Sequence, residues 1–174
     1  MNKFQVKSIE DMIYAYPKLG DHYSFKDGDI QIIVITMEHY DYNFQPLLEL
    51  KFHDVDRSNR VDGSVLVGLS HAEKIIKKLP EIKAASLVFV CCDAGLSRSP
   101  AIAKALAHYL QDIASFTYLS YQYPYANHDV FETILLGLRG DKMTTKRERM
   151  KSLNSMHDVD WKVEKNHKHF KDMK

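Results

Sequence analysis

The chain has 174 residues, of which 45% are hydrophobic and 27% are charged. This length fits one domain with a sizeable core, or a domain followed by a tail, and the composition is ordinary for a soluble globular protein. The net charge of +1 gives no general reason to expect nucleic acid or an anionic membrane as a partner, and no apolar run is long enough to span a bilayer.

The first part of the chain predicts a helix followed by two strands. Ser8 and Asp11 have the spacing of a capping box, and apolar residues then recur at helical spacing until Pro17 and Gly20. Residues 30–35 form a continuous apolar run, which is typical of a buried strand, and residues 47–52 alternate as a strand does. The tyrosine-rich loop between these strands either borders a functional site or is an ordinary aromatic-lined loop.

Two carboxylates follow the second predicted strand and are candidates for acid–base chemistry. Asp54 comes directly after Phe52 and His53, and Asp56 lies two residues further on. A general acid that serves a strand-end site would lie in such a loop. Both carboxylates also fit solvated loop positions, which is the usual situation of aspartate side chains.

The middle of the chain predicts a third strand between helices. Ser70 has the spacing of a capping box for a helix that ends at Pro80, and residues 87–92 form a buried strand. A helix is expected from Ser99 to Asp112, because Pro100 suits its first turn, and an apolar stripe predicts another over residues 127–138. This alternation predicts an α/β domain with a central, mostly parallel sheet flanked by helices.

The loop after the third predicted strand holds the residues that point to chemistry. Backbone N–H groups at a helix N-terminus can surround a tetrahedral dianion, and Gly95 permits backbone angles that a side chain would forbid. Arg98 offers a planar pair of donors to phosphoryl oxygens. We expect this positive field to stabilise the thiolate of Cys92, and Ser99 to donate a hydrogen bond to the same sulfur. The predicted phosphate-binding residues are Asp93, Ala94, Gly95, Leu96, Ser97 and Arg98.

This loop resembles the signature loop of the cysteine-dependent protein tyrosine phosphatases. A cysteine, five residues, an arginine and a serine, with glycine in third place, are shared with the dual-specificity branch and its small microbial relatives. The resemblance covers roughly residues 25–138 and implies a phosphotyrosine protein phosphatase-like fold of the dual-specificity type. It implies that Cys92 is the catalytic nucleophile, that Arg98 binds the phosphate and that Ser99 assists the sulfur.

The resemblance also implies a general acid upstream of the nucleophile. Asp54 matches the family's position best, and Asp56 is the alternative. The family usually has a histidine immediately before the nucleophile, where this chain has Cys91. Two interpretations of Cys91 are open: a small buried hydrophobic residue, or a partner that protects Cys92 through a reversible disulfide.

The activity implied by the resemblance is that of a protein phosphatase. It would hydrolyse phosphotyrosine, with or without phosphoserine and phosphothreonine, through a phosphocysteine intermediate and without a cofactor or metal. The expected partner is a phosphorylated protein or peptide, and a nucleophilic thiol favours the reducing cytoplasm. Two alternatives remain, a rhodanese-like sulfurtransferase and a phosphopeptide-binding module without turnover. Low-molecular-weight phosphatases, which carry the cysteine loop near the N-terminus, fit the order of this chain poorly.

The composition changes after Gly140. Residues 141–174 contain ten Lys or Arg and six Asp or Glu, so this segment is basic whereas residues 1–140 are slightly acidic. We predict a phosphatase-like catalytic domain over residues 1–140 and a charged, partly helical C-terminal tail over residues 141–174. His157, His167 and His169 lie in the tail, but no cysteine accompanies them, and we predict no metal site there.

Overall fold

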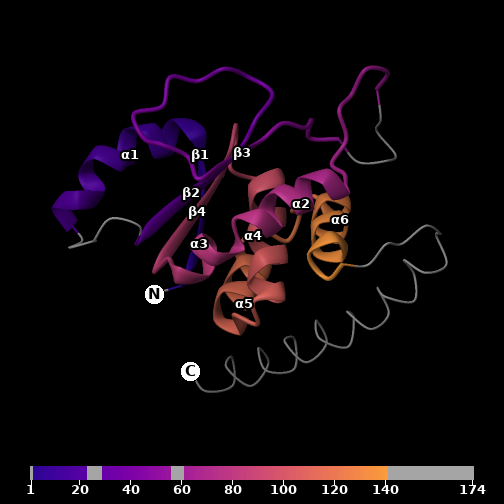
Figure 1. The fold of residues 1–174 in the computed structure, drawn as a ribbon. Helices are drawn as coiled ribbons and strands as arrows, with labels where there is room; N and C mark the ends of the chain where they lie inside the picture. Colours follow the sequence, from indigo (N-terminus) through magenta and orange to yellow (C-terminus); the bar gives the residue numbers. More distant parts are fainter. Residues whose placement is uncertain (1, 23–28, 56–60, 141–174) are drawn as a thin grey trace. The chain divides into compact units, whose positions relative to one another are not determined.

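The computed structural model describes residues 2–22, 29–55 and 61–140, apart from the side chains of residues 18–22. These residues form an α/β fold around a four-stranded parallel sheet with strand order β1-β4-β2-β3 (Figure 1). The strands are β1 (Phe4–Ser8), β2 (Ile30–Ile35), β3 (Leu48–Leu50) and β4 (Leu87–Cys92). The predicted α/β fold with a mostly parallel sheet is confirmed.

The two central strands explain the apolar runs in the sequence. All six residues of β4 are buried, and the last four of β2 are buried as well. A strand that is covered on both faces has a continuous apolar sequence, because neither face is exposed to water. Ile35 and Cys92 are register partners at the carboxyl ends of β2 and β4, so the loops after these strands leave the same edge of the sheet.

Helices cover both faces of the sheet. They are α1 (Ile9–His22), α2 (Leu69–Lys77), α3 (Leu79–Ala84), α4 (Arg98–Tyr109), α5 (Ile113–Gln122) and α6 (His128–Leu138). Figure 1 shows α1 on one side of the sheet and α4 on the other, where α5 and α6 pack against α4 and α2 packs against α6. Gly137 allows the last contact, because a Cβ atom there would lie 2.3 Å from the Cβ of Ala72.

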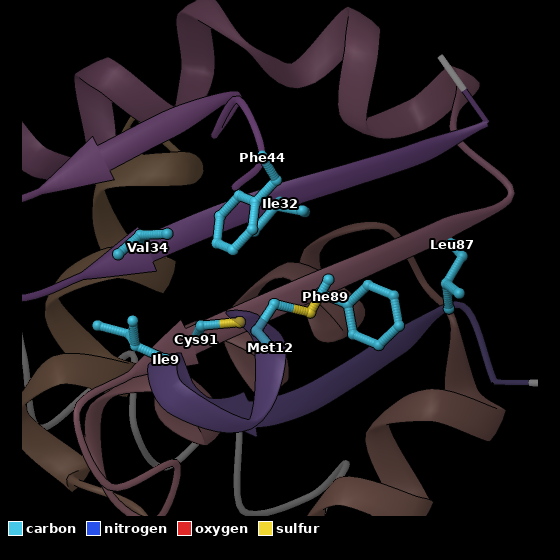
Figure 2. Close-up of a cluster of buried hydrophobic side chains, with 8 residues drawn as sticks. All are labelled: Ile9, Met12, Ile32, Val34, Phe44, Leu87, Phe89 and Cys91. Carbon is cyan, nitrogen blue, oxygen red and sulfur yellow. The ribbon is translucent and has the colours of Figure 1, made fainter. Parts of the chain in front are cut away.

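The core under α1 is drawn in Figure 2. Ile9 and Met12 of α1 and Phe44 of the loop before β3 pack on alternate residues of the two central strands: Ile32, Val34, Leu87, Phe89 and Cys91. Because successive side chains of a strand point to opposite faces, Cys91 lies in this core and Cys92 faces α4. Both cysteines are free thiols.

Several local predictions are confirmed and others are wrong. Asp11 donates its backbone N–H to the side-chain oxygen of Ser8 at 3.0 Å, as a helix cap requires. Helix α1 continues through Pro17, where we predicted its end. Helix α2 begins one residue before Ser70, and Pro80 lies in the first turn of a second short helix, α3, instead of simply ending α2. Neither strand β1 nor helix α5 was predicted.

Some of the sequence predictions concern residues outside the described ranges. This applies to Asp56, the alternative general acid, and to the tail over residues 141–174 with its three histidines. None of the helices in the described part of the chain has the length and apolar composition needed to cross a bilayer.

Candidate active site

The loop over residues 93–97 connects the carboxyl end of β4 to the N-terminus of α4. Gly95 is buried in this loop and has a φ of +70°, a conformation that L side chains rarely adopt. A Cβ atom on Gly95 would lie 2.6 Å from the backbone nitrogen of Ser8, at the end of β1. The loop therefore packs directly against the neighbouring strand, and glycine is required for this contact.

Cys92 ends β4 and faces the N-terminus of α4. Its side chain is almost completely buried, and its Sγ atom lies 3.0 Å from the Oγ atom of Ser99. Ser99 is itself fully buried in the first turn of α4. A hydroxyl group in this position can donate a hydrogen bond to a thiolate and so stabilise the negative charge on the sulfur.

Arg98 is the first residue of α4 and only 7% exposed. Its Nη1 atom donates a hydrogen bond to the carbonyl oxygen of Phe52 at 3.0 Å, and its Nη2 atom pairs with the carboxylate of Asp93. The buried Nε atom has no hydrogen-bond partner among the described residues. A buried guanidinium donor without a partner can bind an oxyanion, since its hydrogen bond is otherwise lost on burial.

Asp54 is held against the same loop, although it lies far from it in the sequence. Its Oδ1 atom accepts hydrogen bonds from Ser97 Oγ at 2.8 Å and from Asn127 Nδ2 at 3.1 Å. Its Oδ2 atom lies 3.9 Å from the free Nε atom of Arg98. Because Oδ1 already has two donors, Oδ2 is the oxygen that can carry a proton towards a group bound beside Arg98.

Asn127 was not predicted as a site residue. Its backbone N–H donates to the carbonyl oxygen of Ser97 at 3.2 Å, and its Oδ1 atom accepts from the backbone N–H of Val130 at the start of α6. With the hydrogen bond to Asp54, Asn127 thus links the acid, the candidate phosphate loop and α6. The sequence places Asn127 at the start of a predicted helix, but nothing local indicated its role as the cap or the two longer-range contacts.

Asp93 is the first residue of the loop and a predicted phosphate-binding residue. Its carboxylate is hydrogen-bonded within the protein. Its Oδ1 atom accepts hydrogen bonds from Thr36 Oγ1 at 2.7 Å and from the Tyr40 hydroxyl at 3.2 Å, and its Oδ2 atom pairs with Arg98. Burial raises the pKa of Asp93, but the hydrogen bonds from Thr36 and Arg98 outweigh burial and hold that pKa below its usual value. Of the two interpretations of the tyrosine-rich loop, the structure favours the one that borders the site.

A comparison with solved structures found chains whose folds are similar to the fold of this chain. The chain is similar to human DUSP28, with a TM-score of 0.51 and 14% identity over 90% of this chain and 96% of that one. It is also similar to PTPMT1, with a TM-score of 0.50 and 12% identity over 81% of this chain and 92% of that one. This chain has the fold of the dual-specificity phosphatases. No protein-family model matches the sequence, and no curated protein sequence matches it.

Cys91 stands at the position where the phosphatases that this loop resembles usually have a histidine. Burial, together with a smaller electrostatic contribution from the adjacent Cys92, raises the pKa of Cys91 to about 12. Its side chain packs with Met12 and Phe89 in the core under α1 (Figure 2). The alternation of side chains along β4 places Cys92 on the opposite face of the sheet. These features support the interpretation of Cys91 as a small hydrophobic residue and oppose a disulfide with Cys92.

The loop also contains the predicted residue Leu96, and Tyr123, which was not predicted, lies near Cys92. Leu96 at the tip of the loop is 67% exposed. Tyr123, after α5, is close enough to Cys92 to be affected by it: burial, with smaller electrostatic contributions from Tyr118 and Cys92, raises the pKa of Tyr123. Across the described residues, no three His, Cys, Asp or Glu side chains gather in the manner of a metal site.

Proposed function

We propose that this chain is a phosphatase that hydrolyses phosphate monoesters through a phosphocysteine at Cys92. The observation that carries the proposal is the position of Asp54, which contacts Ser97 of the loop and faces the free Nε atom of Arg98. A carboxyl group, a guanidinium donor and a cysteine at the end of β4 are the three groups that phosphoryl transfer to sulfur requires.

In the first half of the reaction, the Cys92 thiolate attacks phosphorus in line with the leaving oxygen. A phosphorus–sulfur bond forms and the phosphorus–oxygen bond to the substrate breaks. Arg98 and the amides of the loop neutralise the non-bridging oxygens, and Asp54 donates the proton on Oδ2 to the departing oxygen. The products of this half are the free alcohol or phenol and the phosphocysteine.

In the second half, Asp54 acts as a base. It takes a proton from a water molecule, which attacks phosphorus and breaks the phosphorus–sulfur bond, so that inorganic phosphate leaves and the thiolate returns. Ser99 assists this step, because its hydroxyl lies 3.0 Å from the sulfur and stabilises the charge of the leaving thiolate. No metal or cofactor is required, since Arg98 and the loop supply the positive field.

The substrate that fits best is a phosphorylated protein or peptide, with phosphotyrosine as the first choice and phosphoserine or phosphothreonine as further possibilities. Cys92 is nearly inaccessible from solvent, so a phosphate carried on a long aryl side chain reaches it more easily than one on a short side chain. Residues 93–97 contain no Lys or Arg, and the carboxylate of Asp93 is already paired with Arg98. This loop therefore lacks the additional positive charge that a multiply phosphorylated head group would require.

The sulfurtransferase and the binding module are less well supported. A sulfurtransferase needs a cradle for sulfur but no general acid, and the contacts of Asp54 would then have no chemical purpose. A module that only binds phosphopeptides needs neither a nucleophile nor an acid. A nucleophilic thiol also favours a reducing compartment, so we propose a cytoplasmic location.

The proposal is tested by steady-state hydrolysis of p-nitrophenyl phosphate and of a phosphotyrosine peptide. We expect wild-type protein to release phosphate from both and Cys92→Ser to release none above background. Thiosulfate and cyanide, assayed in parallel, should give no thiocyanate. Equal hydrolysis by wild-type protein and Cys92→Ser would contradict the mechanism, and thiocyanate formation without hydrolysis would favour the sulfurtransferase.

A further inference from the structure

The guanidinium of Arg98 is a buried cation with a specific set of partners. A buried charge is tolerated only when it is paired and hydrogen-bonded. The carbonyl of Phe52 fixes Nη1 and the carboxylate of Asp93 fixes Nη2, which leaves Nε without a hydrogen-bond partner in the described part of the chain. Phe52 and Asp93 together thus determine the orientation of the guanidinium and of its Nε atom.

Asp93 is in turn held by two hydroxyl groups. Thr36, fully buried directly after β2, donates its hydroxyl to Oδ1 of Asp93 at 2.7 Å. The Tyr40 hydroxyl donates to the same oxygen at 3.2 Å. Burial and the charge of Asp93 raise the pKa of Tyr40, so its hydroxyl keeps its proton and remains a donor. Both oxygens of Asp93 are therefore occupied, and its rotamer is fixed.

The two supporting hydroxyls are anchored to the rest of the fold. Thr36 donates its backbone N–H to the carbonyl oxygen of Leu50 at 3.1 Å, which fixes it to β3. The ring of Tyr40 stacks on Tyr42 with a centroid distance of 6.3 Å, and Tyr42 stacks on Phe44 at 5.2 Å. Phe44 belongs to the core under α1 (Figure 2), so this aromatic row connects the core to the candidate active site.

We propose that Asp93 is a positioning residue, which orients Arg98 so that Nε points to a bound phosphate, with Thr36 and Tyr40 as its supports. The inference rests on the proposed function, because a phosphate must bind beside Arg98 for the orientation to matter. In this role the carboxylate of Asp93 does not touch the substrate, and it acts only through the guanidinium. The opposite role, in which Asp93 competes with phosphate for Arg98 and inhibits the site, is the outcome that the first experiment separates from positioning.

The first experiment measures phosphate binding without turnover. Inorganic phosphate is titrated into wild-type protein and Asp93→Asn by isothermal calorimetry, and kcat and KM for p-nitrophenyl phosphate are measured on the same samples. We expect Asp93→Asn to raise the Kd of phosphate and to lower kcat/KM by about 10–100-fold, the effect of losing a hydrogen bond between charged groups. Tighter phosphate binding and a higher kcat/KM in Asp93→Asn would overturn the proposal in favour of competition.

The second experiment separates positioning from a general loss of structure. Tyr40→Phe removes one hydroxyl and keeps the stacked ring, and Tyr42→Phe is its matched control, because the Tyr42 hydroxyl is buried without a hydrogen-bond partner among the described residues. We expect Tyr40→Phe to raise the Kd of phosphate by about 2–10-fold and Tyr42→Phe to leave it within about twofold.

The double variant of Asp93→Asn and Tyr40→Phe completes the test. If Tyr40 acts through Asp93, the second substitution changes the Kd of phosphate by less than about twofold in the Asp93→Asn background. Full additivity of the two effects would contradict the proposal. Wild-type protein that binds phosphate but does not hydrolyse p-nitrophenyl phosphate would contradict only the proposed function, since the binding measurements need no turnover.

Discussion

Asn127 donates a hydrogen bond from its side-chain amide to the carboxylate of Asp54 at 3.1 Å, across 73 residues of sequence. The other side-chain atom of the same amide, Oδ1, accepts the backbone N–H of Val130 and caps α6. The Asn127 side chain therefore both orients the candidate acid Asp54 and caps the first turn of α6. The stability of α6 and the position of Asp54 can be separated by substitution, because they use different atoms of Asn127.

Substitution of Asn127 tests this division. Asn127→Ser keeps an oxygen that can cap α6 and loses the donor to Asp54, whereas Asn127→Ala loses both. We expect both variants to lower kcat/KM for p-nitrophenyl phosphate by about 2–10-fold. Only Asn127→Ala should also lower the free energy of unfolding, by about 0.5–2 kcal/mol in urea titration. Full activity in Asn127→Ser would contradict the positioning of Asp54 by this amide.

Gly95 offers a test of the loop geometry with a matched control. Gly95 and Gly63 both have positive φ, but only at Gly95 would a Cβ atom collide with the neighbouring backbone. We expect Gly63→Ala to lower the free energy of unfolding by about 1–2 kcal/mol, the usual penalty of this conformation, without loss of activity. Gly95→Ala should be less stable than Gly63→Ala and lose about 10²-fold in kcat/KM, since the loop must shift. Similar results for the two variants would argue against a tightly packed loop.

The two adjacent cysteines should differ sharply in reactivity. With a pKa of about 12, Cys91 has a thiolate fraction on the order of 10⁻⁵ at neutral pH, and its side chain is buried as well. We expect iodoacetamide to label the native protein at Cys92 and not at Cys91, as located by peptide mass spectrometry. Denatured protein, in which both residues react, is the control. Labelling of native protein at Cys91 alone would contradict both the assignment of Cys92 as the reactive thiol and that of Cys91 as a buried, unreactive one.

A pH-dependent contribution to stability is expected from a pair on α6 that has no part in the proposed reaction. On α6, the Nε2 atom of His128 lies 2.6 Å from the Oε1 atom of Glu132. The hydrogen bond between these two side chains raises the pKa of His128 above its ordinary 6.5. A raised pKa adds stability that is fully present below about pH 6.5 and is lost as the pH rises through the raised value. His128→Gln should therefore lower the free energy of unfolding more at about pH 5 than at about pH 9, by less than about 1 kcal/mol because the ring is mostly exposed. In a Glu132→Gln background the pH dependence should disappear, and its persistence there would assign it to another group.

Much of the sheet was predictable because its central strands are buried on both faces. The runs over residues 30–35 and 87–92 have no polar alternation, and both coincide with strands. Strand β1 was missed because it is a short edge strand in which only Phe4 is fully buried, so its sequence has no continuous apolar run. Helix α1 was expected to end near Pro17, but the helix continues through this residue to His22.

The site was predictable where the residues are adjacent in sequence. Cys92, Arg98 and Ser99 lie within residues 92–99, and their spacing, together with Gly95, the buried strand before them and the helix after them, indicated a phosphate site. The contacts of Asp93 with Thr36 and Tyr40 cross 57 and 53 residues, and no local pattern indicates such pairs. The sequence predicted Asp93 as a phosphate-binding residue of the loop, and the pairing of its carboxylate with Arg98 emerges only from the structure.

The most direct test of a phosphocysteine is to trap it. Asp54→Asn lacks the base for hydrolysis, but p-nitrophenolate leaves without a strong acid, so the intermediate should accumulate when this variant is mixed with p-nitrophenyl phosphate and quenched in acid. We expect mass spectrometry to find one phosphoryl group on the peptide that contains Cys92, absent from Cys92→Ser, and steady-state turnover reduced by about 10²–10⁴-fold. A phosphoryl group on another residue, or a fully active Asp54→Asn without any adduct, would contradict the account.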